Sequence, residues 1–448
     1  MHSKLRKLTK KLLFEAEKAG ADKADVIALG DFSISVDILS GSLEKAERSE
    51  STEIGLRVII NKKQACVSSS LLDDSSLKIA AERAVSIAKH GTEDPHVGLA
   101  LENQIASTWN IEALELSENS VEPPIEYLER LALLAESSAK SVRGVSKVQS
   151  VTTFHRKKYL HVCATNGFSG GYIKTQNGLF CSAISGHGTQ MERDGFGDVR
   201  VHRNDLITPE EIGLKAGKRA VKRANPQKPK TGFYPVLFHE RISSSLINHL
   251  LTAIDGKTIA LGNSWTKSLL GNPILPKKVS LLENPLKVRS LASRPFDIEG
   301  LPTNKRCIIN KGNLEGWTLD LATSRQLGYK STANAHRGVG SPPVPSITNI
   351  YLSGDNDSFC CLVKKLHTGL LVTSLIGLTI NQNTGDYSRG VSGFWVENGE
   401  IQYPINECTI AGNLKEMLLS IIVGNDAKPH KSISIPSLLV GGMTIAGK

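Results

Sequence analysis

The sequence lacks the features that identify membrane and secreted proteins. Its longest apolar stretch, Leu370 to Ile380, is interrupted by threonine, serine and glycine and is well short of the roughly 20 residues that a membrane-spanning helix needs. The first 20 residues mix lysine and arginine into every turn, whereas a secretory signal has an uninterrupted apolar segment. We therefore expect a cytoplasmic protein without a membrane partner.

The cysteines form no recognisable framework. Seven are scattered along the chain without a C-x-x-C pair, which excludes a zinc ribbon and argues against a set of disulfides. We expect reduced thiols. The sequence also contains no P-loop and no G-x-G-x-x-G segment, so nothing in it indicates a nucleotide cofactor.

An excess of positive charge raises the question of nucleic-acid binding. The formal net charge is +10, and the lysines and arginines gather in two places, at residues 4–10 and 215–230. Neither cluster is accompanied by a recognition-helix, RNA-binding or zinc-finger signature, and charged faces of solvated helices explain both. Nucleic acid is therefore an unlikely partner.

The hydrophobic pattern predicts an α+β protein in two parts. Residues 3–20, 74–88 and 124–141 have apolar positions at helical spacing, and residues 33–38, 54–60, 64–70 and much of 147–185 read as antiparallel strands. Thr208-Pro209-Glu210-Glu211 predicts the start of a further helix, because it combines a capping threonine, a first-turn proline and acidic residues. We expect an antiparallel sheet flanked by helices in this part.

A proline-containing polar segment at 224–232 marks the boundary between the two parts. It divides the chain into an amino-terminal α+β domain, residues 1–228, and a carboxy-terminal domain, residues 229–448. The second domain is expected to be β-dominated with few helices, including a short strand at Tyr234–Phe238 that enters a helix at about Glu240, and a hairpin turn at 397–399.

His239-Glu240 begins like a zinc-peptidase motif but does not continue as one. Such a helix carries two histidines on one face and a glutamate that activates water. Ser244 stands where H-E-x-x-x-H requires the second histidine, and His249 is too far along, about 15 Å on a helix. We expect these positions to be a degenerate site, with no metal and no confident catalytic residue in this chain.

Other chemically suggestive patterns have simpler structural interpretations. Gly167–Gly171 matches the letters of a nucleophile elbow, but a strand follows it where that motif needs a helix, so a hairpin is favoured. Two further groups of possible metal ligands lack a recognisable ligand spacing. His161 and Cys163 share one face of a strand, where Cys163 is interpreted as a core thiol. A glycine-rich segment, interpreted as a solvated loop, carries His187, Glu192, Asp194, Asp198 and His202.

Two polar, glycine-bearing segments of the second domain are candidates for holding an extended peptide. They are Lys330–Gly338 and Asn383–Gly390, which we expect to be loops beside strands. The side chains expected to contact substrate are Asn334, His336, Asp386, Tyr387 and Arg389.

Several segments together resemble the TldE (PmbA) proteins. They are Gly385–Gly390, Gly393–Pro404, Thr409–Leu414, Leu291–Asp297, Leu327–Thr332, Val423–Asp426 and, in the first domain, Glu93–Pro95. The resemblance extends over nearly the whole chain.

This resemblance implies a cytosolic subunit that pairs with a homologous TldD chain to form a zinc-dependent peptidase, which matures peptide microcins and degrades small unfolded peptides. The family also has an older label as a modulator of DNA gyrase. In TldD-type chains zinc is held by H-E-x-x-x-H and a distant cysteine. Here Ser244 replaces the second histidine and residues 424–442 contain no cysteine, so zinc is expected in the partner.

Three functional hypotheses therefore stay open at this point. The first is a subunit without metal that helps to hold a peptide for a TldD-type partner. The second is a stand-alone peptidase with a non-standard site at His239 and Glu240, for which a homodimer is one possible form of the isolated chain. The third is a nucleic-acid or gyrase modulator that acts through the basic helix at 215–223.

Overall fold

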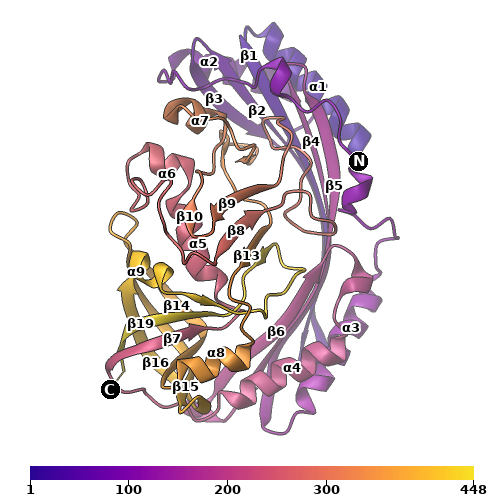
Figure 1. The fold of residues 1–448 in the computed structure, drawn as a ribbon. Helices are drawn as coiled ribbons and strands as arrows, with labels where there is room; N and C mark the ends of the chain where they lie inside the picture. The colour runs from indigo at the N-terminus through magenta and orange to yellow at the C-terminus, as the bar shows by residue number, and fades with distance from the viewer. Residues whose placement is uncertain (448) are drawn as a thin grey trace.

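The structure is a computed structural model, and it describes residues 1–447, without the side chains of His2, Leu378 and Thr379. A large curved sheet forms one side of the molecule, and a small barrel with a second sheet forms the other (Figure 1). The predicted α+β class is confirmed. Among the described residues, no helix is both long and apolar enough to span a membrane.

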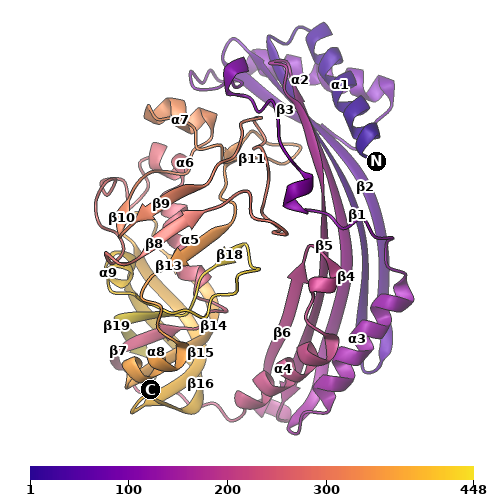
Figure 2. The same ribbon diagram turned by 45° about the vertical axis from the view of Figure 1, so that its right-hand side comes forward.

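Six antiparallel strands form the large sheet, in the order β3-β2-β1-β4-β5-β6. Their bounds are β1 Lys23–Leu39, β2 Ser42–Ile60, β3 Lys63–Ser69, β4 Val145–Ala164, β5 Ser169–Ser185 and β6 Glu192–Arg200. The long strands bend around the second half of the chain (Figure 2). The hairpin expected around Gly167 is confirmed, because it joins β4 directly to β5.

Apolar residues of β1 alternate between the two faces of this sheet. Val26 and Ile34 lie on one face, where they pack against helices at the two ends of the sheet, and Ile27 lies on the opposite face, against the second half of the chain. Successive side chains of a strand point to opposite faces, so both faces bury apolar residues.

Four helices cover that first face: α1 His2–Lys18, α2 Asp74–His90, α3 Ile125–Lys140 and α4 Pro209–Lys222. α1 and α2 pack near one end of the sheet, and α3 and α4 near the other (Figure 2). The predicted start of α4 is confirmed, since the Thr208 hydroxyl accepts a hydrogen bond from the Glu211 amide at 3.3 Å.

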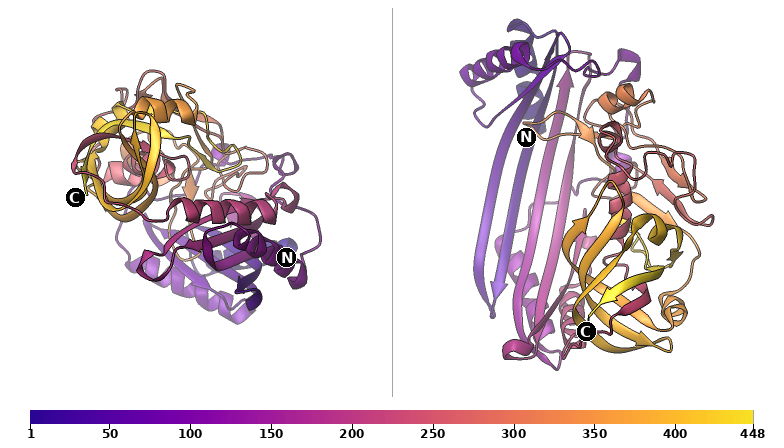
Figure 3. Two further views of the ribbon diagram at one scale, coloured as in Figure 1. Left: turned by 90° about the horizontal axis from the view of Figure 1, so that it is seen from below. Right: turned by 90° about the vertical axis from the view of Figure 1, so that its left-hand side faces the viewer.

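The carboxy-terminal half contains a closed barrel. Its strands are β7 Gly232–Phe238, β14 Gly369–Ile380, β15 Asp386–Glu397, β16 Glu400–Asn413 and β19 Leu438–Ala446, with β17 Ile422–Val423 attached to β19. Pairing of β16 with β19 joins the two ends of the row, and the ring is visible from below (Figure 3). The predicted hairpin turn at 397–399 connects β15 and β16.

A second, smaller sheet lies between the barrel and the large sheet, in the order β10-β9-β8-β13-β18 (Figure 1). Its strands are β8 Ser280–Glu283, β9 Arg306–Asn310, β10 Asn313–Leu314, β13 Ile350–Ser353 and β18 Ile433–Ser434, and a separate pair is formed by β11 Ala335–His336 and β12 Val344–Pro345. Short helices complete this half: α5 Ser244–Ala253, α6 Gly256–Ala260, α7 Leu321–Leu327, α8 Phe359–Leu366 and α9 Leu414–Leu419. One apolar core joins the barrel to this sheet.

Three local predictions were wrong. The helix after β7 begins at Ser244 instead of Glu240, because residues 240–243 form a turn. The segment expected as a glycine-rich loop contributes β6, which carries Glu192, Asp194 and Asp198. The segment from Asp386 to Gly390 is the start of β15, and pairing on both sides with β14 and β16 explains why it is a strand.

The segment between α4 and β7 leads from the large sheet to the barrel. The division of the chain at residue 228 stays our proposal for its domain organisation.

Candidate functional site: a cationic cleft beside His239 and Glu240

A cleft of about 930 Å³ opens between the large sheet and the turn that follows β7. Strands β4 to β6 and helix α4 provide one wall, and the turn at residues 239–241 and the segment 426–431 provide the other. Figure 2 shows β6 and α4 facing the barrel across this region. The degenerate motif therefore lines a cleft that both halves of the chain build.

His239 lines this cleft and is held in place by two neighbours. Its ring packs edge-on against Phe359 with 5.2 Å between centroids, and its Nδ1 atom accepts a hydrogen bond from the Arg241 amide at 3.3 Å. Burial lowers the pKa of His239 to about 4, and the nearby Arg241 contributes in the same direction. The imidazole is neutral at pH 7.

Glu240 is buried and is neutralised by a lysine from a distant segment. Lys431 Nζ lies 3.1 Å from Glu240 Oε2. The Glu240 amide donates to the Ser437 hydroxyl at 3.0 Å, and that hydroxyl donates to Asp426 at 2.7 Å. These contacts tie the turn after β7 to the segment that precedes β19.

The residues at this turn do not fit a zinc ion. Ser244 begins α5 and provides no imidazole, and the Lys431 ammonium occupies the carboxylate that would face a metal-bound water. In the part of the chain that the structure describes, no three His, Cys, Asp or Glu side chains are grouped as metal ligands. We therefore derive no metal-dependent step for this chain.

Helix α4 presents a stripe of positive charge to the cleft. Its members follow the spacing i, i+3, i+4, i+7: Lys215, Lys218, Arg219 and Lys222. The opposite face of α4 carries small, mostly apolar residues that pack on the sheet. This packing turns the charged face of the helix toward the cleft. Lys215 and Arg219 lie over the ring of Phe196, 4.9 and 4.7 Å from its centroid.

Two arginines form ion pairs with β6, and one of them, Arg241, connects the two walls. Arg241 donates to both oxygens of Asp194 at 3.0 to 3.1 Å, and Arg223 reaches Glu192 at 3.3 Å. Burial lowers the pKa of Arg219, and the positive charge of Arg241 adds to this effect. Cations therefore outnumber carboxylates in this cleft.

Several other residues that the sequence suggested as possible metal ligands make contacts within the chain. Asp198 pairs with Arg200 at 2.8 Å, and His202 Nε2 lies 3.1 Å from the Glu115 carbonyl oxygen. His161 is buried, with its Nδ1 atom 2.9 Å from the Thr9 hydroxyl oxygen. Burial raises the pKa of Cys163 to about 11, so its thiol is protonated at pH 7.

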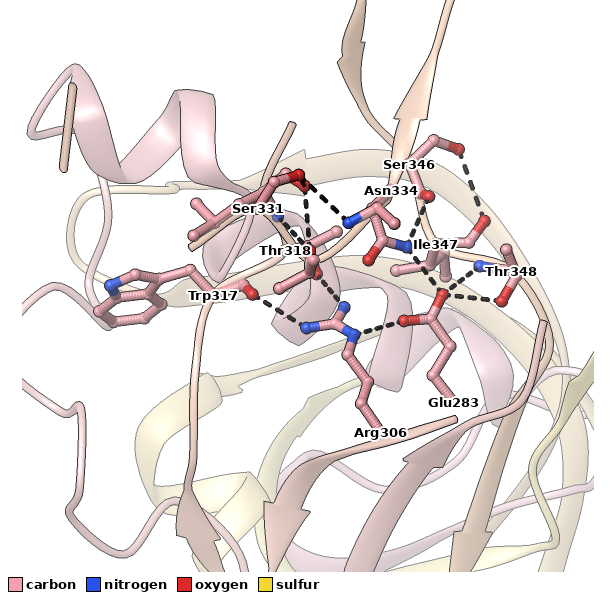
Figure 4. Close-up of polar contacts among 12 residues, drawn as sticks. Glu283, Arg306, Trp317, Thr318, Ser331, Asn334, Ser346, Ile347 and Thr348 are labelled. Atoms are coloured by element: carbon pink, nitrogen blue, oxygen red, sulfur yellow. Dashed lines mark hydrogen bonds and ion pairs between the residues drawn. The ribbon is translucent and has the colours of Figure 1, made fainter. Parts of the chain in front are cut away.

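Asn334, expected to contact substrate, lies inside a polar network of the smaller sheet (Figure 4). Its amide donates to Glu283 at 2.9 Å and to the Ser346 carbonyl at 3.0 Å. Glu283 also accepts from Thr348 and from Arg306. Asn334 is only 2% exposed, so direct contact with a peptide would require this network to open. Its predicted role stays a prediction.

The other four expected substrate contacts divide between two places. His336 lies on β11 and lines a separate cavity against the large sheet. Asp386, Tyr387 and Arg389 lie on β15, where Asp386 is exposed and accepts a hydrogen bond from Asn413 at 3.0 Å.

A buried polar group links β15 to α5. Arg389 donates to the Ser245 hydroxyl at 2.9 Å, and the Tyr387 ring lies 6.0 Å from that of His249. Burial lowers the pKa of His249 to about 4 and raises that of Tyr387. The structure thus brings His249, Tyr387 and Arg389 together, away from Asn334 and His336.

Sequence reasoning missed the cleft residues of the segment 426–431, above all Lys431 and Lys428. The one signal in the sequence is that this segment lies within residues 424–442, where TldD-type chains carry a metal-binding cysteine and this chain has none. No sequence spacing relates it to Glu240, which precedes Lys431 by almost 200 residues.

Comparison with known proteins gives matches over nearly the whole chain. Three consecutive sequence profiles match: PmbA/TldA metallopeptidase domain 1 at residues 24–88, the central domain at 114–224 and the C-terminal domain at 231–447. The chain is 33% identical to Metalloprotease PmbA of Escherichia coli O157:H7, over 97% of this chain and 94% of that protein.

Solved structures share the fold. A putative modulator of DNA gyrase from Bacteroides thetaiotaomicron superposes with a TM-score of 0.88 at 23% identity, over 99% of this chain and 98% of that one. TldE from Thermococcus kodakarensis superposes with a TM-score of 0.84 at 20% identity, over 98% of this chain and 100% of that one. At these identities the likeness establishes the arrangement of the elements.

Proposed function

The chain belongs to the PmbA/TldD metallopeptidase family, and from that premise we propose that it is the TldE/PmbA-type subunit of a two-chain zinc peptidase. In this proposal a TldD-type partner in the cytoplasm supplies the zinc ion and the hydrolytic step. The present chain binds no metal and helps to hold small unfolded peptides, by side chains of its cationic cleft.

One observation carries the proposal: the ion pair between Glu240 and Lys431. A glutamate beside a zinc ion serves as a general base only when its carboxylate is free to accept a proton from the metal-bound water. Here the Lys431 ammonium, 3.1 Å from Glu240 Oε2, occupies the carboxylate that would have to contact such a water. Ser244, which provides no imidazole where a second zinc ligand would be needed, supports the same conclusion.

A role for the cleft in holding peptide has separate support. Peptides carry a terminal carboxylate and often acidic side chains, which the α4 stripe would attract at the entrance. The cleft lies between the two halves of the chain, where binding sites are commonly found. Proteolysis would then depend on the partner's zinc, with this chain determining how the peptide is presented.

The test is reconstitution from separately purified full-length chains. Peptide hydrolysis is measured for this chain, for the TldD-type chain and for the mixture, each with and without a chelator, and zinc content is measured for each chain. We expect activity in the mixture only, abolished by the chelator, with zinc in the TldD-type chain.

One double variant separates the alternatives. Replacing His239 and Glu240 together by alanine in this chain should leave zinc content and the chemical step unchanged. Chelator-sensitive hydrolysis by this chain alone, with stoichiometric zinc and loss of activity in the double variant, would establish the stand-alone peptidase instead. Gel filtration of the isolated chain would show whether it forms a homodimer.

A further inference from the structure

A second cavity, of about 510 Å³, lies between the large sheet and two segments of the carboxy-terminal half. Strands β1, β4 and β5 form one wall, and residues 290–298 and 336–338 form much of the other. They overlap two segments singled out in the sequence, residues 291–297 and 330–338. The peptide-holding cleft proposed above involves neither segment. The cavity is distinct from the cleft at Glu240.

Basic groups in this cavity have unused hydrogen-bonding capacity. Arg294 is 7% exposed and donates to the carbonyl oxygens of Ala335 and Ser346, but its Nε atom has no partner among the described residues. Arg337 is 3% exposed and donates to Asp25, whereas its Nε and Nη1 atoms have no partner there. These nitrogens are enclosed by protein atoms, so the two guanidinium groups act on the cavity through their positive charge.

Lys174 adds a third positive group. It extends from β5 on the same face as Tyr172, and its Nζ atom donates to the Leu291 carbonyl oxygen at 3.2 Å. No carboxylate of the described chain forms an ion pair with it. Burial lowers the pKa of Lys174 to about 7, and the charges of Arg294 and Lys158 contribute. A bound anion would restore its ordinary charge.

The carboxylates that line this cavity are already engaged. Asp31 pairs with Arg156. Asp297 accepts hydrogen bonds from the amides of Glu299, Leu301 and Ala335, each at 3.0 Å. The cavity therefore has an excess of positive charge.

Much of the remaining lining is apolar. It includes Ile27, Leu29, Leu160, Tyr172, Phe296 and Ile298. A volume of about 510 Å³ lies within the range of small-molecule sites, and an apolar wall with a few polar groups is their usual composition. An inorganic ion would leave this wall without a partner.

We propose that this cavity binds a small organic carboxylate with an apolar body, such as a hydrophobic amino acid or dipeptide. Lys174 holds the carboxylate, and the enclosed guanidinium groups of Arg294 and Arg337 stabilise its charge from the wall. His336 lines the same space, and the apolar side chains pack against the body. The site would allow a hydrolysis product or a peptide end to be sensed away from the cleft. Its existence does not depend on the partner subunit.

The test is calorimetric titration of the isolated full-length chain with four probes. They are leucyl-phenylalanine, its carboxy-terminal amide, 3-phenylpropionate and inorganic phosphate. We expect the dipeptide to bind, and the amide to bind at least about tenfold more weakly because it lacks the charged acceptor. Binding of 3-phenylpropionate would identify any apolar carboxylate as the ligand class, and its failure would restrict the class to peptides and amino acids.

Variants locate the binding. Lys174→Met should weaken dipeptide binding at least about tenfold, while Lys174→Arg retains most of it. His336→Ala, at an exposed position, gives a second variant whose folding is not at risk and should weaken binding severalfold. Lys147→Met on the exposed part of β4 is the matched control. Equal binding of dipeptide and amide, tighter binding of phosphate, or an unchanged affinity in Lys174→Met and His336→Ala would overturn the proposal.

Discussion

The ammonium of Lys431 lies 3.1 Å from the carboxylate of Glu240, in the wall of the cationic cleft. The Glu240 side chain is 8% exposed, whereas that of Lys431 is 42% exposed, so the carboxylate has less access to water than its partner. The pair joins the turn after β7 to the segment before β19. It lies at the position where the sequence reads His-Glu.

Removing the lysine should destabilise the protein, and removing both charges should restore stability. We expect Lys431→Met to lower the free energy of unfolding by about 1 kcal/mol, because it leaves Glu240 without its ion-pair partner while the lysine itself was partly exposed. The double variant Lys431→Met/Glu240→Gln should recover most of this loss. Urea denaturation of the four proteins of this cycle measures the coupling, and a coupling near zero would contradict the ion pair.

Stability should fall as pH decreases from 7 to 5, in part because of His239. Its pKa is lowered to about 4 by burial, below the ordinary value near 6.5 of the unfolded chain. The unfolded state therefore binds the proton first, and the stabilisation present above pH 6.5 is lost as the pH falls toward 4. We expect a loss of about 1 to 2 kcal/mol between pH 7 and pH 5.

The measurement for this prediction is urea denaturation across that pH range. The slope should be smaller in His239→Gln, and His90→Gln, an exposed substitution on α2, should keep the wild-type slope. An identical slope in His239→Gln would show that His239 titrates normally.

A buried ion triad fixes the second half of the chain against the large sheet. Asp25 on β1 accepts hydrogen bonds from Arg57 and from Arg337, both at 2.5 Å. We expect Asp25→Asn to lower the free energy of unfolding by about 3 to 5 kcal/mol, because it leaves two buried guanidinium groups without a counter-charge. Asp22→Asn, in the exposed turn before β1, is the control for a surface aspartate.

The same triad predicts a loss of stability in acid. Burial alone would raise the pKa of Asp25, but Arg57 and Arg337 together lower it below its ordinary value. Its contribution is therefore complete above about pH 4 and is lost as the pH falls through the lowered pKa. Acid unfolding followed by circular dichroism should occur at higher pH in Asp25→Asn than in the wild type.

Charge reversal on α4 should weaken the binding of acidic peptides. Lys218 and Lys222 are exposed and adjacent on the charged stripe. We expect Lys218→Glu/Lys222→Glu to weaken binding of a fluorescein-labelled glutamate-rich peptide severalfold, measured by anisotropy at low salt. Lys7→Glu/Lys10→Glu on α1 changes the net charge equally and should have little effect.

The same titration with double-stranded DNA tests the nucleic-acid hypothesis. Tight DNA binding that falls steeply with salt and depends on the α4 lysines would favour a nucleic-acid role for this stripe. Preference for the acidic peptide would favour the peptide-holding role.

The sequence by itself determined most of the secondary structure and the failure of the metal motif. Alternation along β1, the capping threonine at the start of α4 and the hairpin turn at Asn166–Gly167 are local signals, and local backbone chemistry is sufficient to interpret them. Ser244 is a local signal of the same kind, because the motif requires a histidine at that fixed spacing and the sequence alone shows that it is missing.

Local reading failed where tertiary contacts override it. The turn after β7 delays α5 to Ser244 because Glu240 and Ser243 are bonded to Ser437 and Ile435 of a distant segment. The sequence of Asp386 to Gly390 predicts a polar loop, but in the closed barrel this segment pairs with β14 and β16 and forms the start of β15.

Only the tertiary structure decided which charged and polar groups meet. Glu240 with Lys431, Asp25 with Arg337, and Lys174 with Leu291 are each more than 100 residues apart along the chain, and no periodicity relates their positions. Burial then gives these contacts their energetic weight, because a charge removed from water must find a partner within the fold. The sequence supplies the side chains, and the packing of the barrel against the curved sheet determines what each of them contacts.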